Sequence, residues 1–350
     1  MVTNKNLRIV FLGTPEFAAI ILEKMIESGY KPMAVVTAPD KPIGRKKIIT
    51  PSATKLLAIK YNIQILQPEV LSISNFSLDP ELGTEGQLPI ANPDLIVLAA
   101  YGQIIPKEIL KIPKYGCLNV HPSLLPKYRG PSPIQTAILN GDEKTGVTII
   151  LMDEKIDHGP ILAWRELEIL NPKSEIRNKS QIQNSKITYP ELTEELAELG
   201  AKLLIETLPK WIKGEIKPIP QDDSKATYTK IIKKEDGKIN WQKSAEEIER
   251  MIRAFTPWPG TYTYIKSQIP STKPQTQNQK MLKIIKAKVL KIDHQKEPGT
   301  IFLTEKKEPA IACKKDALIL EEVQLEGKRK MIAKDFLNGY PEILDQVLIF

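Results

Sequence analysis

"RIVFLGTPEFAAIIL", residues 8 to 22, decides how the N-terminal part of the chain folds. Its first five residues are a short apolar run that ends at Gly13, which is typical of a buried strand. Thr14 is placed to cap a helix whose first position is Pro15, and apolar residues follow at helical spacing. A strand that leads directly into a helix is the first unit of a parallel α/β sheet.

The same alternation of strand and helix continues along the chain. Strands are expected at residues 33–37, 63–66, 94–100, 116–120 and 146–152, and helices near residues 51–61, 133–140 and 192–212. This spacing favours a parallel sheet with helices on both faces, whose ligands bind beyond the carboxyl ends of the strands. The sequence therefore predicts an α/β domain over residues 1–207.

A second domain of a different kind is expected after a linker. Residues 214–228 are polar and contain prolines, so we place the linker at 208–224 and the second domain at 225–350. Apart from a helix near 245–255, that domain consists of short β-rich segments, at 260–265, 281–291, 299–303, 310–312 and 317–324. Such segments predict a small β-barrel, for which an oligonucleotide-binding (OB) type is one option.

Length and composition agree with a two-domain globular protein. The chain has 350 residues, of which 41% are hydrophobic and 26% charged. Its two cysteines, Cys117 and Cys313, are far apart, so the sequence has no disulfide framework or zinc-binding spacing, and no metal is expected. No apolar run has the length of a signal peptide core or a membrane span. We therefore expect a cytoplasmic protein without membrane attachment and, because no stretch marks an apolar interface, a monomer.

The positive charge lies mostly in the C-terminal third. Residues 221–350 hold 24 Lys and Arg against 18 Asp and Glu, which is most of the net charge of +8. This excess permits a polyanionic partner without requiring one. Motifs of the common nucleotide cofactors are missing, since Gly13 stands alone where GxGxxG is needed and GxxxxGK[ST] does not occur. GxSxG and HExxH are missing too, which leaves the usual hydrolases and metalloproteases without a motif.

A candidate site begins at "NVHPSLLPKYRG", residues 119–130. Asn119 and His121 are two residues apart on an expected strand, so their side chains share one face and could stabilise an oxyanion. Asp157, in the turn "DHG", follows another strand and could reach the same crevice, where it would favour the protonated imidazole and order a water. The alternatives are a turn-capping asparagine, a packed core histidine and an ordinary turn aspartate. His158 has a weaker claim, and His294 is expected to be solvated.

Two loops offer candidate binding residues. Residues 123–130 form a proline-stiffened loop that could line a pocket for a flat heteroaromatic ligand with a carboxylate tail, or could be a packed connection. The basic loop "DKPIGRKK", residues 40–47, could contact phosphate or could be a solvated run of charge. Its basic residues are Lys41, Arg45, Lys46 and Lys47.

Several motifs resemble the methionyl-tRNA formyltransferase family. The N-terminal ones, shared with the wider folate-dependent formyltransferases, are "RIVFLGTPEFA" (8–18), "GRKKIITPSATKLLA" (44–58), "PDLIVLAAYGQIIP" (93–106) and the stretch from Gly116 to Leu162. The C-terminal ones, "ATYTKIIKKEDGKINW" (226–241), "RAFTPWPGTY" (253–262) and "EEVQLEGKRKM" (321–331), resemble the tRNA enzymes alone. The chain departs from the family pattern at Ala53 and Thr54, where the family usually has Pro-Val.

The resemblance implies a fold and a reaction. It implies a Rossmann-like formyltransferase domain joined by a linker to an OB-like barrel, and transfer of a formyl group from 10-formyltetrahydrofolate to the amino group of initiator Met-tRNA. Asn119 and His121 would stabilise the tetrahedral oxyanion formed by direct attack of the amine, and Asp157 would assist proton transfer. The segment Ser123, Leu124, Leu125 and Pro126 would contact the folate. Lys41, Arg45, Lys46 and Lys47 would contact the tRNA.

Two other functions remain open at this point. The same three residues and folate loop would serve a formyltransferase that acts on a small amine, such as glycinamide ribonucleotide or an amino-sugar nucleotide. A non-catalytic RNA-binding protein with the same fold is the other. The polar stretches 171–187 and 268–280 are expected to be loops and are given no function.

Overall fold

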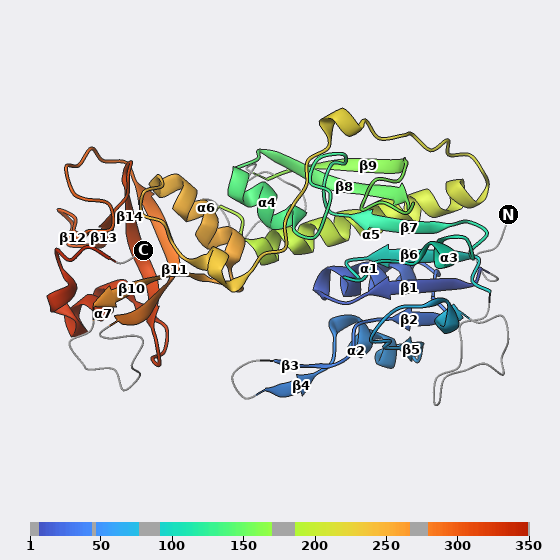
Figure 1. Cartoon of the computed structure of the whole chain (residues 1–350), viewed down its shortest axis with the longest axis horizontal. Helices are drawn as coiled ribbons and strands as arrows, with labels where there is room; N and C mark the ends of the chain where they lie inside the picture. Colours follow the sequence, from blue (N-terminus) through green and yellow to red (C-terminus); the bar gives the residue numbers. More distant parts are fainter. Residues whose placement is uncertain (1–6, 44–46, 77–91, 170–185, 267–278, 349–350) are drawn as a thin grey trace. The chain divides into compact units, whose positions relative to one another are not determined.

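The computed structural model describes residues 7–43, 47–76, 92–169, 186–266 and 279–348. The described residues form two compact units (Figure 1). Unit 1 takes its residues from 1–134, 143–184 and 191–230, and unit 2 takes its residues from 135–142, 185–190 and 231–350. The polar stretches 171–187 and 268–280 lie almost wholly outside the described residues.

Unit 1 is built on a seven-stranded sheet, whose strands Figure 1 shows side by side. Their order is β5 (Gln64–Leu66), β2 (Ala34–Val36), β1 (Ile9–Gly13), β6 (Leu95–Ala99), β7 (Cys117–His121), β8 (Lys144–Leu151) and β9 (Ile161–Glu168). The first five are parallel, as predicted, and every residue of β1, β6 and β7 is buried. Continuous burial is typical of a parallel sheet covered on both faces.

The sheet is mixed rather than wholly parallel. β8 runs antiparallel to β7, and β9, which the sequence did not predict, runs antiparallel to β8. Only residues 152–160 connect β8 to β9. A connection this short suits an antiparallel pair, because a parallel pair needs a crossover of a dozen or more residues. From Ala163 to Glu168 the residues of β9 alternate between less exposed and fully exposed positions, as expected for an edge strand.

The predicted helices of unit 1 begin and end close to their expected positions, and the structure adds a short helix at Lys107–Leu110 that the sequence did not predict. The helices are α1 (Glu16–Glu27), α2 (Ala53–Lys60), α3 (Lys107–Leu110) and most of α5 (Tyr189–Ile212), with 3₁₀ turns η2 (Ile73–Phe76) and η4 (Asp223–Lys225); α4 (Pro133–Asn140) follows β7 in the chain. The predicted cap of α1 is wrong. Pro15 occupies the cap position with no side-chain bond, and the Thr14 hydroxyl donates to the Tyr101 carbonyl oxygen at 3.3 Å instead. Thr14 therefore ties β1 to the residues that follow β6.

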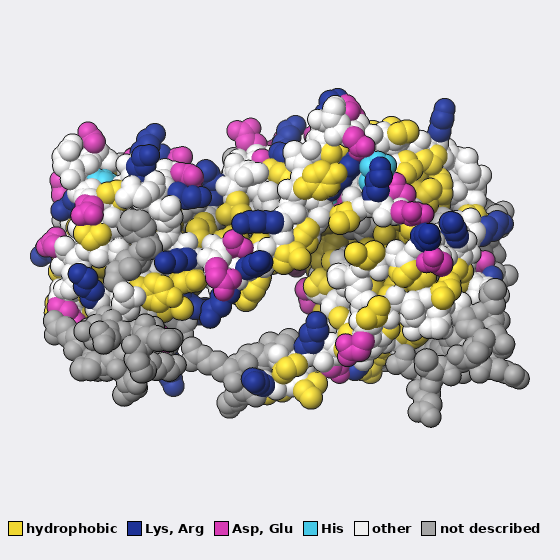
Figure 2. Space-filling model, in the orientation of Figure 1, with side chains coloured by type: hydrophobic (Ala, Val, Ile, Leu, Met, Phe, Trp, Pro, Cys, Tyr) yellow, Lys and Arg dark blue, Asp and Glu magenta, His cyan; other side chains and the backbone are white. Residues whose placement is uncertain are grey.

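The predicted basic loop is a β-hairpin. β3 (Lys41–Ile43) pairs antiparallel with β4 (Ile48–Thr50), and Figure 1 shows the hairpin extending away from the seven-stranded sheet. Ile48 and Ile49 are 61% and 71% exposed. Figure 2 shows hydrophobic and basic side chains together on this hairpin.

Unit 2 is an antiparallel sheet with helices. Its strands run in the order β10 (Thr261–Lys266), β11 (Gln279–Leu290), β14 (Ala317–Leu325), β13 (Pro309–Ala312) and β12 (Ile301–Leu303), with β15 (Met331–Ile332) beside β14. The helical segments are α6 (Ala245–Phe255), α7 (Ala333–Gly339), η5 (Lys234–Gly237) and η6 (Pro341–Ile343). In the described residues β10 and β12 are the edges of the sheet and do not pair, so the predicted barrel is an open half-barrel.

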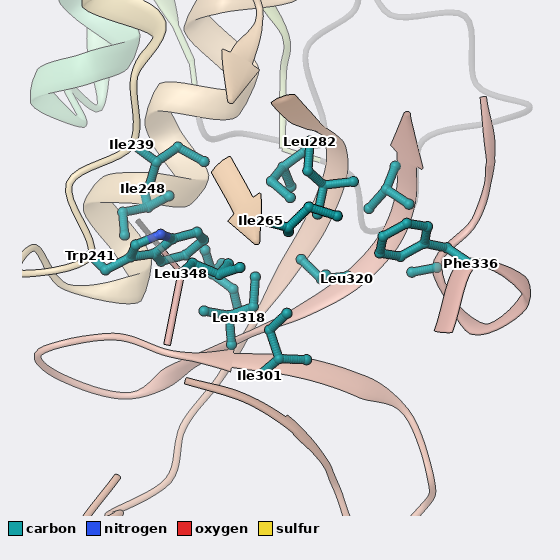
Figure 3. Close-up of a cluster of buried hydrophobic side chains, with 14 of the residues drawn as sticks. Ile239, Trp241, Ile248, Ile265, Leu282, Ile301, Leu318, Leu320, Phe336 and Leu348 are labelled. Atoms are coloured by element: carbon teal, nitrogen blue, oxygen red, sulfur yellow. The ribbon is translucent and has the colours of Figure 1, made fainter. Parts of the chain in front are cut away.

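The core of unit 2 is organised around Trp241. Its side chain is fully buried, and its indole N–H donates to Thr263 Oγ1 at 3.2 Å. Figure 3 shows Trp241 among Ile248 of α6 and Leu318 of β14. α6 begins with a capping box, in which the Ser244 hydroxyl and the Glu247 carboxylate each accept a backbone N–H of the other residue.

We expect Trp241→Ala to destabilise unit 2 by about 3–5 kcal/mol, because it removes a large buried side chain and leaves a cavity. Urea unfolding followed by circular dichroism measures this loss. The matched control is Trp258→Ala, since Trp258 is 57% exposed and should cost far less. Equal losses in the two variants would contradict the assignment of Trp241 as the centre of this core.

Candidate active site

Strand β7 places two of the predicted catalytic side chains on one face. Asn119 and His121 lie in β7 two positions apart, and their exposed fractions are only 6% and 4%. His121 is the last residue of the strand, so both side chains lie at the carboxyl end of the sheet, where α/β proteins bind ligands.

The turn after β8 brings Asp157 to the same place. Asn119 Nδ2 donates to Asp157 Oδ1 at 3.0 Å, and His121 Nδ1 lies 3.5 Å from the same oxygen. The other carboxylate oxygen, Oδ2, accepts the backbone N–H of Gly130 at 2.8 Å. The structure thus brings Asn119, His121 and Asp157 together, although 36 residues separate His121 from Asp157 in the chain.

The turn that carries Asp157 has an unusual backbone. Asp157 has a φ of +47°, a region that aspartate enters more easily than most residues but still at a cost. Gly159 packs against β8 so closely that a Cβ there would collide with the carbonyl oxygen of Leu151. Glycine at this position therefore allows the close approach that puts the Asp157 carboxylate beside β7.

The hydrogen bonds of His121 determine which nitrogen carries its proton. His121 Nε2 lies 2.9 Å from the carbonyl oxygen of Tyr128. A carbonyl oxygen only accepts, so Nε2 carries a hydrogen and the neutral ring has its lone pair on Nδ1, beside Asp157. A ring protonated on both nitrogens donates to both neighbours. Nδ1 is therefore the atom at which this imidazole gains or loses a proton.

The predicted folate loop is rigid and partly buried. The Ser123 hydroxyl donates to the Lys127 carbonyl oxygen at 2.6 Å, so this side chain is used within the loop. The buried Thr148 hydroxyl of β8 donates to the Ser123 carbonyl oxygen at 2.7 Å and accepts the Leu125 N–H at 3.1 Å. Leu125 is buried, whereas Leu124 and Pro126 are half-buried. These last two are the apolar side chains of the segment that a ligand could still contact.

Arg129, in the loop that follows the predicted folate segment, is a further buried member of the site. Its side chain is 1% exposed, and its guanidinium donates to Asp223 Oδ1 at 2.8 Å and to Gln221 Oε1 at 2.9 and 3.1 Å. Burial by itself lowers the pKa of Arg129, but the hydrogen bonds to Asp223 and Tyr228 more than reverse this, so the net pKa is raised. The loop sequence suggests that this cation could meet acidic groups, and the structure identifies Asp223 as one of them.

The two remaining histidines lie outside the cluster of Asn119, His121 and Asp157. His158 lies between two carboxylates, with Nδ1 at 2.5 Å from Asp153 Oδ2 and Nε2 at 3.3 Å from Asp223 Oδ2. His294, expected to be solvated, is half-buried in unit 2, and its Nε2 lies 2.8 Å from the Asp316 carbonyl oxygen. That prediction is wrong, because the loop after β11 folds back on the residues that precede β14.

The predicted tRNA-binding residues are only partly described. Lys41 and Lys47 are exposed on the β3–β4 hairpin, and Lys47 has a φ of +49°. Arg45 and Lys46 lie outside the described residues.

The chain matches known proteins along most of its length. Residues 7–205 match the formyl transferase family, and residues 231–341 match the formyl transferase C-terminal domain. Methionyl-tRNA formyltransferases from Caldicellulosiruptor saccharolyticus and Enterococcus faecalis are each 43% identical to it, over 95% of this chain and 96% of theirs. The chain belongs to the methionyl-tRNA formyltransferase family.

More distant structures share the fold of this family member. An N-formyltransferase from Helicobacter canadensis, in complex with folinic acid and dTDP-3-aminofucose, is 19% identical with a TM-score of 0.57, over 93% of this chain and all of that one. HypX from Aquifex aeolicus, in complex with tetrahydrofolic acid, is 16% identical with a TM-score of 0.57, over 97% of this chain and 48% of that one.

Two further features complete the description of this formyltransferase. Within the described ranges, no group of three or more His, Cys, Asp or Glu side chains is arranged to hold a metal ion. Among the same residues, no helix combines the length and the apolar character needed to cross a membrane.

We expect the Arg129–Asp223 pair to stabilise the protein only above acidic pH. The hydrogen bond from Arg129 lowers the pKa of Asp223, so its contribution is complete above about pH 4 and disappears as the pH falls through the lowered pKa. Melting temperatures of wild type and Asp223→Asn measured from pH 3 to 7 should differ at neutral pH and converge in acid.

The control for this comparison is Asp293→Asn, whose exposed side chain makes no hydrogen bond to any described residue. Its difference from wild type should stay constant with pH. A difference between wild type and Asp223→Asn that also stays constant would show that the ion pair contributes nothing.

Proposed function

We propose that this protein transfers the formyl group of 10-formyltetrahydrofolate to the α-amino group of methionyl initiator tRNA. The observation that carries the proposal is the cluster of Asn119, His121 and Asp157 at the carboxyl end of the sheet. The choice of substrate is supported by the 43% sequence identity to a methionyl-tRNA formyltransferase, which extends over 95% of the chain. The proposed place of action is the cytoplasm, and the proposed active form is a monomer.

In the proposed mechanism the amine attacks the formyl carbon directly. The new N–C bond makes a tetrahedral intermediate with a negatively charged oxygen. Asn119 uses one N–H for Asp157, and an amide has a second N–H, which would donate to that oxygen. His121 adds positive charge beside the oxyanion when it carries a proton on both nitrogens.

Proton transfer is proposed to pass between His121 Nδ1 and Asp157. The attacking nitrogen must lose a proton, and N10 of the departing tetrahydrofolate must gain one when its bond to carbon breaks. Asp157 Oδ1 lies next to His121 Nδ1 and also accepts from Asn119, so it can order a water that carries the proton between these groups. Reactants and products then balance without a metal or a redox step.

The folate donor is proposed to bind against the loop that follows β7. Leu124 and Pro126 are the half-buried apolar residues of this loop, and they would contact the flat ring of the donor. The Thr148 hydroxyl of β8 holds the loop in place by its hydrogen bond to the Ser123 carbonyl oxygen. This arrangement suits a rigid wall of a binding site, since the loop would not need to order when the donor binds.

The tRNA is proposed to bind both the hairpin, which belongs to the catalytic domain at residues 1–207, and the C-terminal domain at residues 225–350. The chemistry is proposed to take place in the first of these domains alone. An open pocket of about 430 Å³ lies on the sheet of unit 2. Its charged lining residues are Lys286, Lys288, Lys306, Lys307, Lys334, Glu308, Glu321 and Glu322. Ion pairs with Glu321 and Glu308 engage Lys286 and Lys288, so the exposed Lys306, Lys307 and Lys334 are better placed to meet phosphates.

Formyl transfer to charged initiator tRNA should fall about 100- to 1,000-fold in Asn119→Ala, His121→Ala and Asp157→Asn, because each removes a group that stabilises the transition state. The assay compares Met-tRNA with free methionine, glycinamide ribonucleotide and an amino-sugar nucleotide. His294→Ala is the control, since this histidine lies in unit 2. Transfer only to a small amine would show that tRNA is not the substrate. If the wild-type protein transfers no formyl group at all, the non-catalytic RNA-binding function would be favoured.

Replacing Lys306, Lys307 and Lys334 together by alanine should lower the affinity for tRNA. It should also make that affinity less sensitive to salt concentration. Each lysine that neutralises a phosphate contributes about one unit to the slope of log K against log salt concentration. Lys24→Ala, in α1 and paired with Glu27, is the control. An unchanged slope in the triple variant would place the RNA elsewhere.

A further inference from the structure

The segment that follows α5 is docked onto unit 1 by its backbone at two places. Ile219 exchanges two backbone hydrogen bonds of 2.7 and 2.9 Å with Ile161, the first residue of β9. Farther along, Arg129 N donates to Thr227 O and Thr229 N donates to Arg129 O, both at 2.8 Å. These backbone bonds hold both ends of the segment 219–229 next to the candidate active site, and the Thr227 hydroxyl adds a bond by accepting the Tyr128 N–H at 2.8 Å.

Gln221 lies within this docked segment, and its amide is fully used. Its Nε2 donates to the carbonyl oxygens of Asp157 and Gly159, both at 2.8 Å. Its Oε1 accepts from Nε and Nη2 of Arg129 at 3.1 and 2.9 Å. The two donors face two carbonyls and the acceptor faces a guanidinium, so only one orientation of the amide satisfies all four bonds.

We propose that Gln221 is a positioning residue of the catalytic centre, which holds the turn that carries Asp157 against the loop that carries Tyr128 and Gly130. This inference rests on the proposed function. The loop supplies the carbonyl that bonds His121 and the N–H that bonds Asp157. Gln221 joins that loop, through Arg129, to the backbone of the turn.

The backbone of Asp157 explains why such a support is needed. With a φ of +47°, the residue is held in a sparsely populated conformation, which persists only where surrounding bonds determine it. The Gln221 amide bonds the carbonyl of Asp157 itself and that of Gly159, two residues later. Without these bonds the turn can relax and move its carboxylate away from Asn119 and His121.

The first test is the kinetics of Gln221→Ala. We expect kcat for formyl transfer to fall about 10- to 100-fold, as small misplacements of catalytic groups do, with KM for both substrates nearly unchanged. The docked backbone should keep the variant folded, and its melting temperature checks this. The matched control is Gln324→Ala in β14, which removes one amide bond to the Lys328 carbonyl oxygen. A normal kcat, or a change confined to KM, would overturn the proposal.

Two further variants separate positioning from a general structural role. Gln221→Glu keeps an acceptor for Arg129 but has no donor for the two carbonyls, so it should lose as much kcat as alanine. In an Asp157→Asn background, Gln221→Ala should cost less than about threefold, because the group that it positions is already impaired. Full activity of Gln221→Glu would show that Gln221 acts by anchoring Arg129 and does not act by holding the turn. Equal losses of kcat from Gln221→Ala in the wild-type and Asp157→Asn proteins would show that Gln221 has only a general structural role.

A readout independent of activity completes the test. Hydrogen exchange should accelerate about tenfold at the Gly130 amide and across residues 153–160 in Gln221→Ala, while β1 stays unchanged. Unchanged exchange at these sites would overturn the proposal whatever the kinetics. If wild type transfers no formyl group, the proposed function fails, and the exchange comparison still decides whether Gln221 holds the turn.

Discussion

Strand β7 and the loop that follows it both contact the carboxylate of Asp157. Asn119 bonds it from β7, Gly130 bonds it from the loop after β7, and the His121 ring lies beside it. A carboxylate has two oxygens and several acceptor positions, so one group can accept from both neighbours at once. The end of β8 and the close approach of Gly159 bring this group to the end of β7.

The same constraint explains why the residues that precede unit 2 are part of unit 1. A turn with an unfavourable backbone needs partners, and residues 152–160 are too short to supply them internally. The chain after α5 supplies them, since Gln221 bonds the turn and Arg129 bonds Gln221 and Asp223. A segment with the composition of a linker therefore completes the site, and the boundary of unit 1 falls after it.

The sequence predicted the elements that depend on local pattern and missed those that depend on contacts far apart in the chain. The five parallel strands follow from buried apolar runs, and the shared face of Asn119 and His121 follows from strand periodicity. The hairpin at 41–50 and strand β9 were missed, because neither has a continuous apolar run along its whole length. Gln221 lies 92 residues from Arg129, and nothing in "KPIPQDDSK" distinguishes it from a solvated glutamine. Polar residues reveal such roles only when the fold brings their partners together.

The chemistry of the buried groups explains why glutamine suits this position. Arg129 is buried and charged, and its carboxylate partner Asp223 reaches it from the surface with 61% of its side chain exposed. A second carboxylate at position 221 would have to be desolvated beside two backbone carbonyls, which repel it. A neutral amide carries a donor pair and an acceptor on one rigid plane, so it satisfies the carbonyls and the guanidinium together. The positive charge of Arg129 is thus balanced at the surface, and the polarity next to Asp157 is left to Asn119 and His121.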